Sequence, residues 1–309
     1  MVLHLVDPDA SMSQQAETMA RACEEIGFFR LPLSVVPRAV ADEAWTTARD
    51  FFVLPEHVKR RVEFPEPGYP YGWSPYRYET LASSLGDDSA EPDLKESLSV
   101  GPDSGAVVPA GQEETWVRSP SLWPEEPVGL RRAWGAYYRA LSEVAAGLMR
   151  VMAVALELPA DHFDRLIDRP ISSMRALHYP AVTDDPGGSL RAGAHTDYGT
   201  WTVLRTDDVA GLEIRDRDGS WLPVEATTDT FVVNLGDTIE QWTNGRWRST
   251  MHRVSLTSSR PRQSFAFFHM ANWDATIQCL PTCRIDGQEP LHPPVQAGPW
   301  LMEKYRSTV

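Results

Sequence analysis

A histidine and an aspartate stand two residues apart in the stretch GAHTDYGTWTVL, which begins at residue 193. The residues that follow are typical of a β-strand. In a strand, side chains at positions i and i+2 lie on the same face, so His195 and Asp197 are expected to point the same way. An imidazole and a carboxylate side by side are two ligands for a metal ion. A polar turn that leads into a strand would contain the same residues, so the pair needs support from elsewhere in the chain.

A third candidate ligand is His252, in STMHRVSL at the start of another strand-like run. Two histidines and one carboxylate on one face of a metal leave three positions open, as in non-haem Fe(II) oxygenases. Zn(II) usually takes four ligands and does not change its oxidation state. We therefore expect iron at His195, Asp197 and His252, although the ligand set alone also fits a zinc hydrolase.

Arg262 and Ser264 also stand at i and i+2, in the strand-like run RPRQSFAFFHM. A guanidinium and a hydroxyl on one face can together hold a carboxylate, the guanidinium through two parallel hydrogen bonds. This pair predicts a binding site for an anionic co-substrate. The alternative is that Arg262 is a surface cation and Ser264 fills space, as is common for an isolated arginine.

Composition narrows the class of protein. The chain has 309 residues, 42% of them hydrophobic, and a formal net charge of -14, which disfavours nucleic acid and anionic membranes as partners. No apolar run approaches the roughly 20 residues that span a bilayer. The N-terminus lacks the pattern of a signal peptide, so we expect a cytoplasmic protein. Three cysteines are expected to be free thiols, and Cys279 and Cys283 lack the partners of a zinc site.

Periodicity indicates the elements that must position these residues. Apolar spacing predicts helices over 13–26, 37–52 and 130–155, and a short strand over 28–31. Residues 63–126 are rich in Pro and Gly and are expected to be irregular, whereas 171–280 reads as short strands separated by turn dipeptides. We expect an α+β fold with a helix- and loop-rich region over 1–126 and a β-barrel-like core within 127–309, in one compact unit.

The sequence resembles the isopenicillin N synthase-like branch of the 2-oxoglutarate and Fe(II)-dependent oxygenases. The resemblance covers nearly the whole chain and rests on these segments, in this order: RACEEIGFFRL, DLKESLSVG, AHTDYGTWTVLRTDDVAGLEI, GSWLPV, VVNLGDTIEQWTNGRWRSTMHRV and RQSFAFF. It implies a double-stranded β-helix (jelly-roll) core with N-terminal and backing α-helices. It also implies Fe(II), 2-oxoglutarate as co-substrate, and O₂.

The resemblance assigns roles residue by residue. His195, Asp197 and His252 match the family's iron ligands, and Arg262 with Ser264 matches the pair that binds the distal carboxylate of 2-oxoglutarate.

Three further positions bear on the co-substrate. Tyr179, in ALHYP, matches a tyrosine near the co-substrate or the substrate. Leu177 stands where many plant members have Asn, which puts one co-substrate contact in doubt. Arg205, in VLRTDD, is long enough to reach the co-substrate if its side chain faces inward, although a surface position fits equally well.

The implied activity couples oxidative decarboxylation of 2-oxoglutarate to hydroxylation, desaturation or cyclisation of a small organic substrate, such as a secondary metabolite. Two alternatives remain open: an Fe(II) oxidase of the isopenicillin N synthase type that uses no 2-oxoglutarate, and a β-barrel binding protein without catalysis. The carboxylate of Asp197 disfavours halogenation. An apolar or aromatic-walled pocket is expected from Tyr69, Tyr71, Trp73, Tyr76, Tyr78, Trp201, Trp242, Phe268 and Met270.

Overall fold

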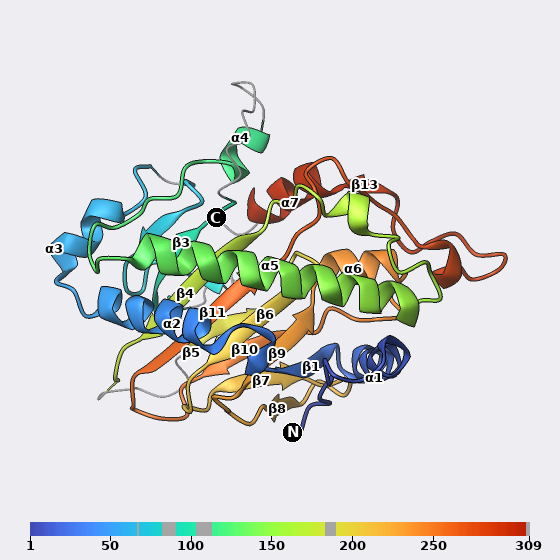
Figure 1. Cartoon of the computed structure of the whole chain (residues 1–309), viewed down its shortest axis with the longest axis horizontal. Helices are drawn as coiled ribbons and strands as arrows, with labels where there is room; N and C mark the ends of the chain where they lie inside the picture. Colours follow the sequence, from blue (N-terminus) through green and yellow to red (C-terminus); the bar gives the residue numbers. More distant parts are fainter. Residues whose placement is uncertain (67, 82–90, 103–112, 183–189, 307–309) are drawn as a thin grey trace.

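The centre of the fold is a seven-stranded antiparallel sheet, seen in a computed structural model that describes residues 1–66, 68–81, 91–102, 113–182 and 190–306 (Figure 1). Its strand order is β1-β9-β6-β11-β4-β3-β2. In chain order these strands are β1 Phe28–Pro32, β2 Gly72–Ser74, β3 Glu96–Val100, β4 Ser173–Tyr179, β6 Trp201–Thr206, β9 Thr230–Leu235 and β11 Arg262–Phe268.

A smaller sheet faces the pocket side of the first one. It has the order β5-β10-β7-β8, and its strands are β5 Leu190–His195, β7 Leu212–Arg215, β8 Trp221–Pro223 and β10 His252–Ser255. A third sheet pairs only β12 Thr276–Ile277 with β13 Val295–Gln296.

The helices cover the outer face of the large sheet and the ends of the sandwich. They are α1 Met12–Glu25, α2 Arg38–Phe52, α3 Glu56–Lys59, α4 Glu114–Val117, α5 Leu130–Ala155, α6 Asp237–Trp242 and α7 Ala297–Arg306. Among the described residues, no helix combines the length and the hydropathy needed to cross a bilayer.

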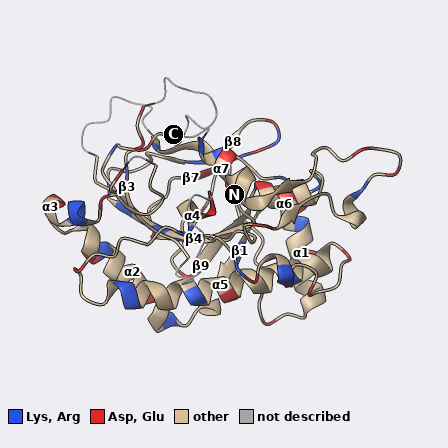
Figure 2. Cartoon of the chain, turned by 90° about the horizontal axis from the view of Figure 1, so that it is seen from above, with Lys and Arg blue, Asp and Glu red and all other residues tan. Residues whose placement is uncertain are grey.

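Helix α5 is the backing helix that the sequence predicts. It runs across the large sheet with α2 beside it (Figures 1 and 2). The rings of Trp134 and Tyr137 on α5 pack against Phe265 on β11, with centroids 4.7 and 5.2 Å apart. Because side chains alternate along a strand, the residues beside Phe265 on β11 are turned to the opposite face, toward the smaller sheet. The packing of α5 therefore decides which β11 residues face the interior between the sheets.

Local signals explain where α1 begins and ends. Ser11 Oγ accepts a hydrogen bond from Gln14 N, while Ser11 N donates to Gln14 Oε1, which forms a capping box. Gly27 follows the helix with φ +76°, and a Cβ there would lie 2.5 Å from Arg248 O. Glycine is therefore required at this turn, which leads directly into β1.

Two regions differ from the sequence-based expectation. Within the segment expected to be irregular, β2 and β3 add two strands to the large sheet, because β3 pairs with β4 and β2 pairs with β3. Residues 67, 82–90 and 103–112 of that segment lie outside the described residues. The C-terminal segment, to which the sequence analysis assigned no element, forms α7. The cysteines are free, as expected, and all three are buried.

Candidate metal centre and active site

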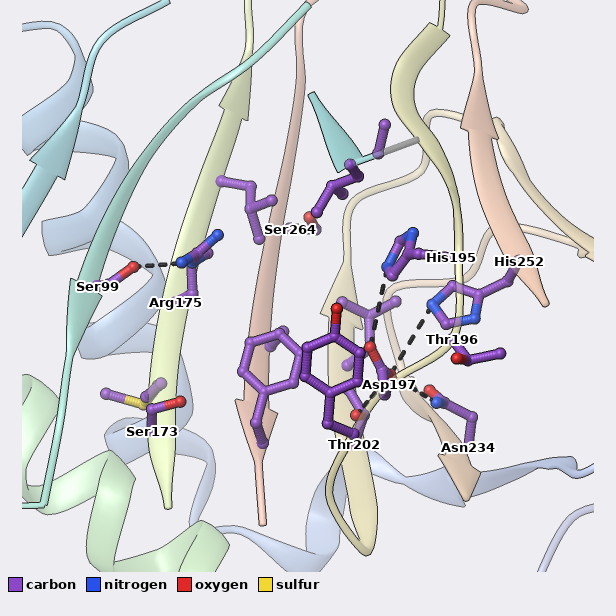
Figure 3. A pocket seen from close by; sticks show the side chains of 18 of the residues that line it. Ser99, Ser173, Arg175, His195, Thr196, Asp197, Thr202, Asn234, His252 and Ser264 are labelled. Carbon is purple, nitrogen blue, oxygen red and sulfur yellow. Dashed lines mark hydrogen bonds and ion pairs between the residues drawn. The ribbon is translucent and has the colours of Figure 1, made fainter. Parts of the chain in front are cut away.

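Three side chains converge at one end of the smaller sheet. His195 on β5 and His252 on β10 lie directly opposite each other, and Asp197 follows two residues after His195 (Figure 3). The ligand atoms of the three residues all lie within 4.8 Å of one another. The Nε2 atoms of His195 and His252 are each 3.8 Å from a different carboxylate oxygen of Asp197. This is the single group of potential metal ligands found among the described residues.

Backbone carbonyls fix the orientation of both imidazoles. His195 Nδ1 lies 2.8 Å from Gly193 O, and His252 Nδ1 lies 3.2 Å from Thr250 O. A carbonyl oxygen can only accept, so each Nδ1 carries the proton and each Nε2 keeps its lone pair. Both lone pairs are available to a metal ion at the shared point.

The carboxylate of Asp197 is held by two hydrogen bonds to one of its oxygens. Thr202 Oγ1 donates to Asp197 Oδ2 over 2.6 Å, and Asn234 Nδ2 donates to the same oxygen over 2.7 Å. Asp197 Oδ1 therefore remains free to bind a metal through one oxygen. The sequence analysis missed both donors. Thr202 and Asn234 lie within segments that carry the family resemblance, but only the pairing of β6 with β9 brings them to Asp197.

Burial sets the charge state of these groups. It lowers the pKa of His195 to about 4, with a further contribution from His252. For Asp197, burial alone would raise the pKa, but His252 and His195, with the hydrogen bonds from Asn234 and Thr202, bring it below the usual range. At neutral pH the site therefore holds a carboxylate and a neutral His195 imidazole, which are the forms that bind metal ions.

A cavity of about 190 Å³ lies between the two sheets and includes the three residues. Alternate residues of β4 and β11 line it, together with side chains from β5, β6, β7, β9 and β10. The alternate residues are Ser173, Arg175, Leu177 and Tyr179 from β4 and Arg262, Ser264, Ala266 and Phe268 from β11, and Met174 on β4 also contributes. The cavity can therefore hold both a co-substrate and a small substrate beside the metal centre.

Arg262, Ser264 and Tyr179 come together at one end of this cavity. Arg262 lies directly opposite Tyr179 in the sheet, and its guanidinium carbon is 5.0 Å from the centre of the Tyr179 ring. Arg262 is 2% exposed, and its Nη1 atom has no hydrogen-bond partner. Its Nε donates to Val209 O over 3.3 Å, but a buried guanidinium nitrogen without a partner is unfavourable, so this end of the cavity is suited to a ligand carboxylate.

A second buried arginine, Arg191, lies near the same tyrosine. Its guanidinium carbon is 5.9 Å from the centre of the Tyr179 ring, and its Nε and Nη1 atoms have no partner. Its Nη2 donates to Ser258 O and to Arg260 O. Burial lowers the pKa of Arg191, and the neighbouring charge of Arg262 lowers it further. The sequence analysis did not identify this residue, which adds positive charge beside Arg262.

The side chain of Arg205 does not reach the cavity, contrary to the expectation that it contacts the co-substrate. Arg205 lies opposite Phe265 on β11, so its side chain is on the face of the sheet that packs against the helices. Its Nη1 donates to Ala41 O over 2.6 Å and its Nη2 donates to Asp42 over 2.8 Å, both on α2. Its guanidinium carbon lies 4.7 Å from the centre of the Trp45 ring. Arg205 thus ties α2 to β6 and does not line the cavity.

The residues expected near the pocket divide into three groups, apart from Tyr69, which does not line the cavity and donates to Pro120 O over 2.7 Å. Tyr71, Phe268 and Met270 line the cavity, together with Tyr198, Trp116 and Tyr305. Trp73, Trp201 and Trp242 are buried in the main hydrophobic core instead. Tyr76 and Tyr78 are exposed. The cavity wall is therefore partly aromatic, but fewer of the expected residues contribute to it.

The geometry and the fold define a class of protein: a jelly roll whose two sheets enclose two histidines and one carboxylate, with positions open for other ligands. Non-haem Fe(II) oxygenases use this arrangement. Residues 170–271 match the family described as 2OG-Fe(II) oxygenase superfamily, and residues 2–126 match the one described as non-haem dioxygenase in morphine synthesis N-terminal. The chain belongs to the 2-oxoglutarate and Fe(II)-dependent oxygenases, as the resemblance implied.

Characterised relatives and solved structures agree with this family. The 2-oxoglutarate-Fe(II) type oxidoreductase hxnY of Emericella nidulans is 32% identical over 305 residues, which cover 97% of this chain and 86% of the relative. The proline hydroxylase buaE of Petromyces alliaceus is 33% identical over 273 residues, covering 84% and 82%. The crystal structure of a full-length Neurospora crassa protein in complex with alpha-KG and thymine has a TM-score of 0.85 and 27% identity, covering 99% and 97%.

These findings confirm the predicted jelly-roll α+β fold and the predicted class of enzyme. The protein is a 2-oxoglutarate and Fe(II)-dependent dioxygenase, an oxidoreductase that uses 2-oxoglutarate and O₂ as co-substrates. The expectation of a 2-oxoglutarate-independent oxidase, or of a binding protein without catalysis, is not supported by the relatives.

Proposed function

We propose that His195, Asp197 and His252 bind the catalytic Fe(II). We also propose that Arg262, Ser264 and Tyr179 bind the distal carboxylate of 2-oxoglutarate. One observation carries this assignment: the three ligand atoms converge within 4.8 Å beside a buried arginine whose Nη1 atom lacks a partner. The ligand set fits iron, and the arginine fits a second carboxylate some distance from it.

The unpaired Arg262 also favours 2-oxoglutarate use over the oxidase alternative. Without 2-oxoglutarate, Arg262 Nη1 would need a carboxylate from the substrate itself. Leaving a buried charge unpaired destabilises a protein, whereas a bound dicarboxylate removes that cost. Arg191, which is also buried and only partly hydrogen-bonded, adds to the same argument.

Iron with 2-oxoglutarate and O₂ supplies the oxidising power for the reaction: 2-oxoglutarate, O₂ and a substrate C–H bond give succinate, CO₂ and the hydroxylated substrate. The protein's part is to hold and orient these groups. Thr202 and Asn234 orient the Asp197 carboxylate, and the backbone carbonyls of Gly193 and Thr250 orient the imidazoles.

We propose hydroxylation of a small organic molecule as the reaction type. The relatives include a proline hydroxylase, and the Neurospora crassa structure contains thymine; proline and thymine are both small ring compounds. A cavity of about 190 Å³ with aromatic walls fits a substrate of this size.

Three further expectations remain proposals. We propose that the chain folds as one unit, because β1, β2 and β3 from the region 1–126 are part of the same sheet as the catalytic strands. We propose that it does not bind nucleic acid, which is supported by the net charge of -14 and by the interspersed acidic and basic residues along α2 and α5 (Figure 2). Its free cysteines support a cytoplasmic location.

The test of the proposed function is succinate release. Purified protein with Fe(II), 2-oxoglutarate and O₂ should release succinate in a metal-dependent reaction, slowly alone and faster with a small-molecule substrate. Asp197→Ala should abolish the release, and the exposed-site control Asp164→Asn should not change it, since Asp164 pairs with Arg150 at the surface. Succinate release that does not need Fe(II), or that survives Asp197→Ala, would refute the assignment.

A further inference from the structure

The substrate side of the cavity contains a charged residue that the family resemblance did not assign. Arg175 lies on β4 between the cavity-lining residues Ser173 and Leu177. Tyr179, at the co-substrate end, is four residues away on the same strand face, or about 13 Å at the usual rise of a strand. Arg175 is therefore far from the proposed 2-oxoglutarate anchor. In Figure 3 it lies across the pocket from His195, Asp197 and His252.

Two neighbours fix the position of the Arg175 guanidinium. Arg175 Nε donates to Ser99 Oγ over 2.8 Å, and Ser99 is the residue directly opposite Arg175 on β3. Arg175 Nη1 donates to both carboxylate oxygens of Glu79, over 3.2 and 3.1 Å. No hydrogen bond occupies Nη2 in the part of the chain that the structure describes. The side chain is 27% exposed, so this remaining donor can be reached by a ligand.

Two cationic side chains line this part of the cavity, and the carboxylates that pair with them lie outside its lining. Lys95 and Arg175 line the cavity, whereas their partners Glu79 and Asp93 do not. Lys95 Nζ lies 2.5 Å from Asp93 Oδ2 and 3.2 Å from Glu79 Oε2. Burial alone would raise the pKa of Glu79, but Arg175 and Lys95 lower it to about 2, so Glu79 is ionised at neutral pH. The four groups are neutral as a set, but the surface that faces the ligand is cationic.

The rest of the cavity lining at this end is apolar and aromatic. It includes Trp116 on α4, Tyr198 after β5, Phe268 and Met270 at the end of β11, and Leu301 and Tyr305 on α7. The rings of Trp116 and Tyr305 are 4.9 Å apart, and those of Tyr198 and Tyr305 are 5.9 Å apart. These rings form a wall between α4 and α7 against which an apolar body can pack.

We propose that the substrate is a small organic carboxylate with an apolar or aromatic body, and that Arg175 binds its carboxylate. Ser99 and Glu79 are positioning residues, because they hold the guanidinium toward the cavity. Lys95 adds positive charge to the same wall. The inference rests on the proposed function, since the apolar body must place a C–H bond beside the metal centre. The free Nη2 of a guanidinium binds a carboxylate more strongly than a neutral amide of the same shape.

The experiment compares acids with their own amides. The probes are phenylacetate, 3-phenylpropanoate and hexanoate, each paired with its primary amide, titrated up to high millimolar concentration into the anaerobic complex of the protein with Fe(II) and 2-oxoglutarate. The readout is a shift of the visible absorption band of that complex with 2-oxoglutarate retained. At least one acid should shift the band, and its amide should bind about tenfold more weakly or worse.

Variants of Arg175 test whether this residue causes the preference for the acid over its amide. Arg175→Met should abolish the preference for the acid while leaving the affinity for 2-oxoglutarate unchanged, and Arg175→Lys should keep part of it. Arg150→Met, which removes a surface arginine paired with Asp164, is the matched control and should behave like the wild type. The unchanged 2-oxoglutarate complex in Arg175→Met shows that this variant is folded.

Several outcomes would overturn the proposal: no acid shifts the band, acid and amide bind equally, the acids displace 2-oxoglutarate, or the preference survives Arg175→Met. Each leaves the proposed function standing, because the band forms before any substrate is added. Absence of the band itself in the wild-type protein would instead refute the metal and co-substrate assignment.

Discussion

Asn234 on β9 donates a hydrogen bond to the carboxylate of Asp197 over 2.7 Å, although 37 residues separate the two in the chain. Thr202 on β6 donates to the same oxygen. Asp197 Oδ2 is thus held by two residues of the large sheet, while Oδ1 accepts neither of these bonds and lies 3.8 Å from His195 Nε2 on the smaller sheet. The metal centre depends on both sheets, and its geometry depends on residues that do not bind the metal.

Removing either donor should weaken metal binding. Asn234→Ala and Thr202→Val each remove one of the two hydrogen bonds that orient the carboxylate, and we expect the affinity for Fe(II) to fall by about 10- to 100-fold, as is typical for partners of metal ligands. Anaerobic titration with Fe(II) measures this. Thr257→Val is the control, since Thr257 is exposed and bonds only to Ala210 O. Unchanged affinity in both variants would show that Asp197 does not need these partners.

Arg262→Met should weaken 2-oxoglutarate binding without destabilising the protein. A hydrogen bond between charged partners contributes about 1.5–3 kcal/mol, so KM for 2-oxoglutarate should rise by about 10- to 100-fold. Ser264→Ala removes one neutral donor, and a rise of about 2- to 10-fold is expected. Thermal unfolding without 2-oxoglutarate should occur no earlier in Arg262→Met, because the substitution removes a buried cation with an unpaired nitrogen. A normal KM in both variants would contradict the assigned anchor.

Arg205→Met should have the opposite effect. Arg205 bonds to Ala41 O and to Asp42 on α2, so its loss should reduce the free energy of unfolding by about 1–3 kcal/mol. KM for 2-oxoglutarate should stay within about twofold of the wild type, since the side chain points away from the cavity. Denaturant unfolding and steady-state kinetics on the same preparation test both parts. A large rise in KM with unchanged stability would place Arg205 in the pocket after all.

His269 should make stability depend on pH. Burial lowers its pKa to about 4 in the folded protein, whereas an unfolded histidine titrates near about 6.5. The unfolded state therefore takes up the proton first as the pH falls. The contribution of His269 to stability is complete above about pH 6.5 and is lost progressively toward pH 4, by at most about 3 kcal/mol.

The comparison that tests this uses His269→Gln. Unfolding by denaturant, measured between pH 7 and pH 5, should show a shallower fall in stability for His269→Gln than for the wild type. His57→Gln changes an exposed histidine and should follow the wild-type curve. Parallel curves for all three proteins would mean that His269 is not the residue responsible.

The sequence predicted the parts of the fold that depend on local pattern. The helices α1, α2 and α5 follow from apolar stripes bounded by Gly and Pro, and their observed ends lie within a residue or two of the expected ones. The strands β2 and β3 were missed, because Pro- and Gly-rich flanks hide them and because β3 is defined by pairing with β4, far along the chain. The helix α7 was missed because its short segment starts at a Gly-Pro pair, which usually ends a helix.

The residues of the site could likewise be predicted only where their placement depends on local sequence pattern. The i, i+2 spacing predicted that His195 and Asp197 share a face, and Arg262 and Ser264 likewise, because strand alternation is local. Asn234 and Arg175 could not be assigned from spacing, since their roles depend on which strands are neighbours. Arg205 was misplaced because both faces of β6 are buried, so hydrophobicity does not tell which one faces the cavity.

The most direct test of the metal and co-substrate assignment is visible absorption under anaerobic conditions. Wild-type protein with saturating Fe(II) and 2-oxoglutarate should show the charge-transfer band of an Fe(II) complex chelated by the co-substrate. Asp197→Ala and His252→Ala should abolish the band, while Asp164→Asn should keep it. Absence of the band in the wild type, or an unchanged band in both ligand variants, would contradict the account.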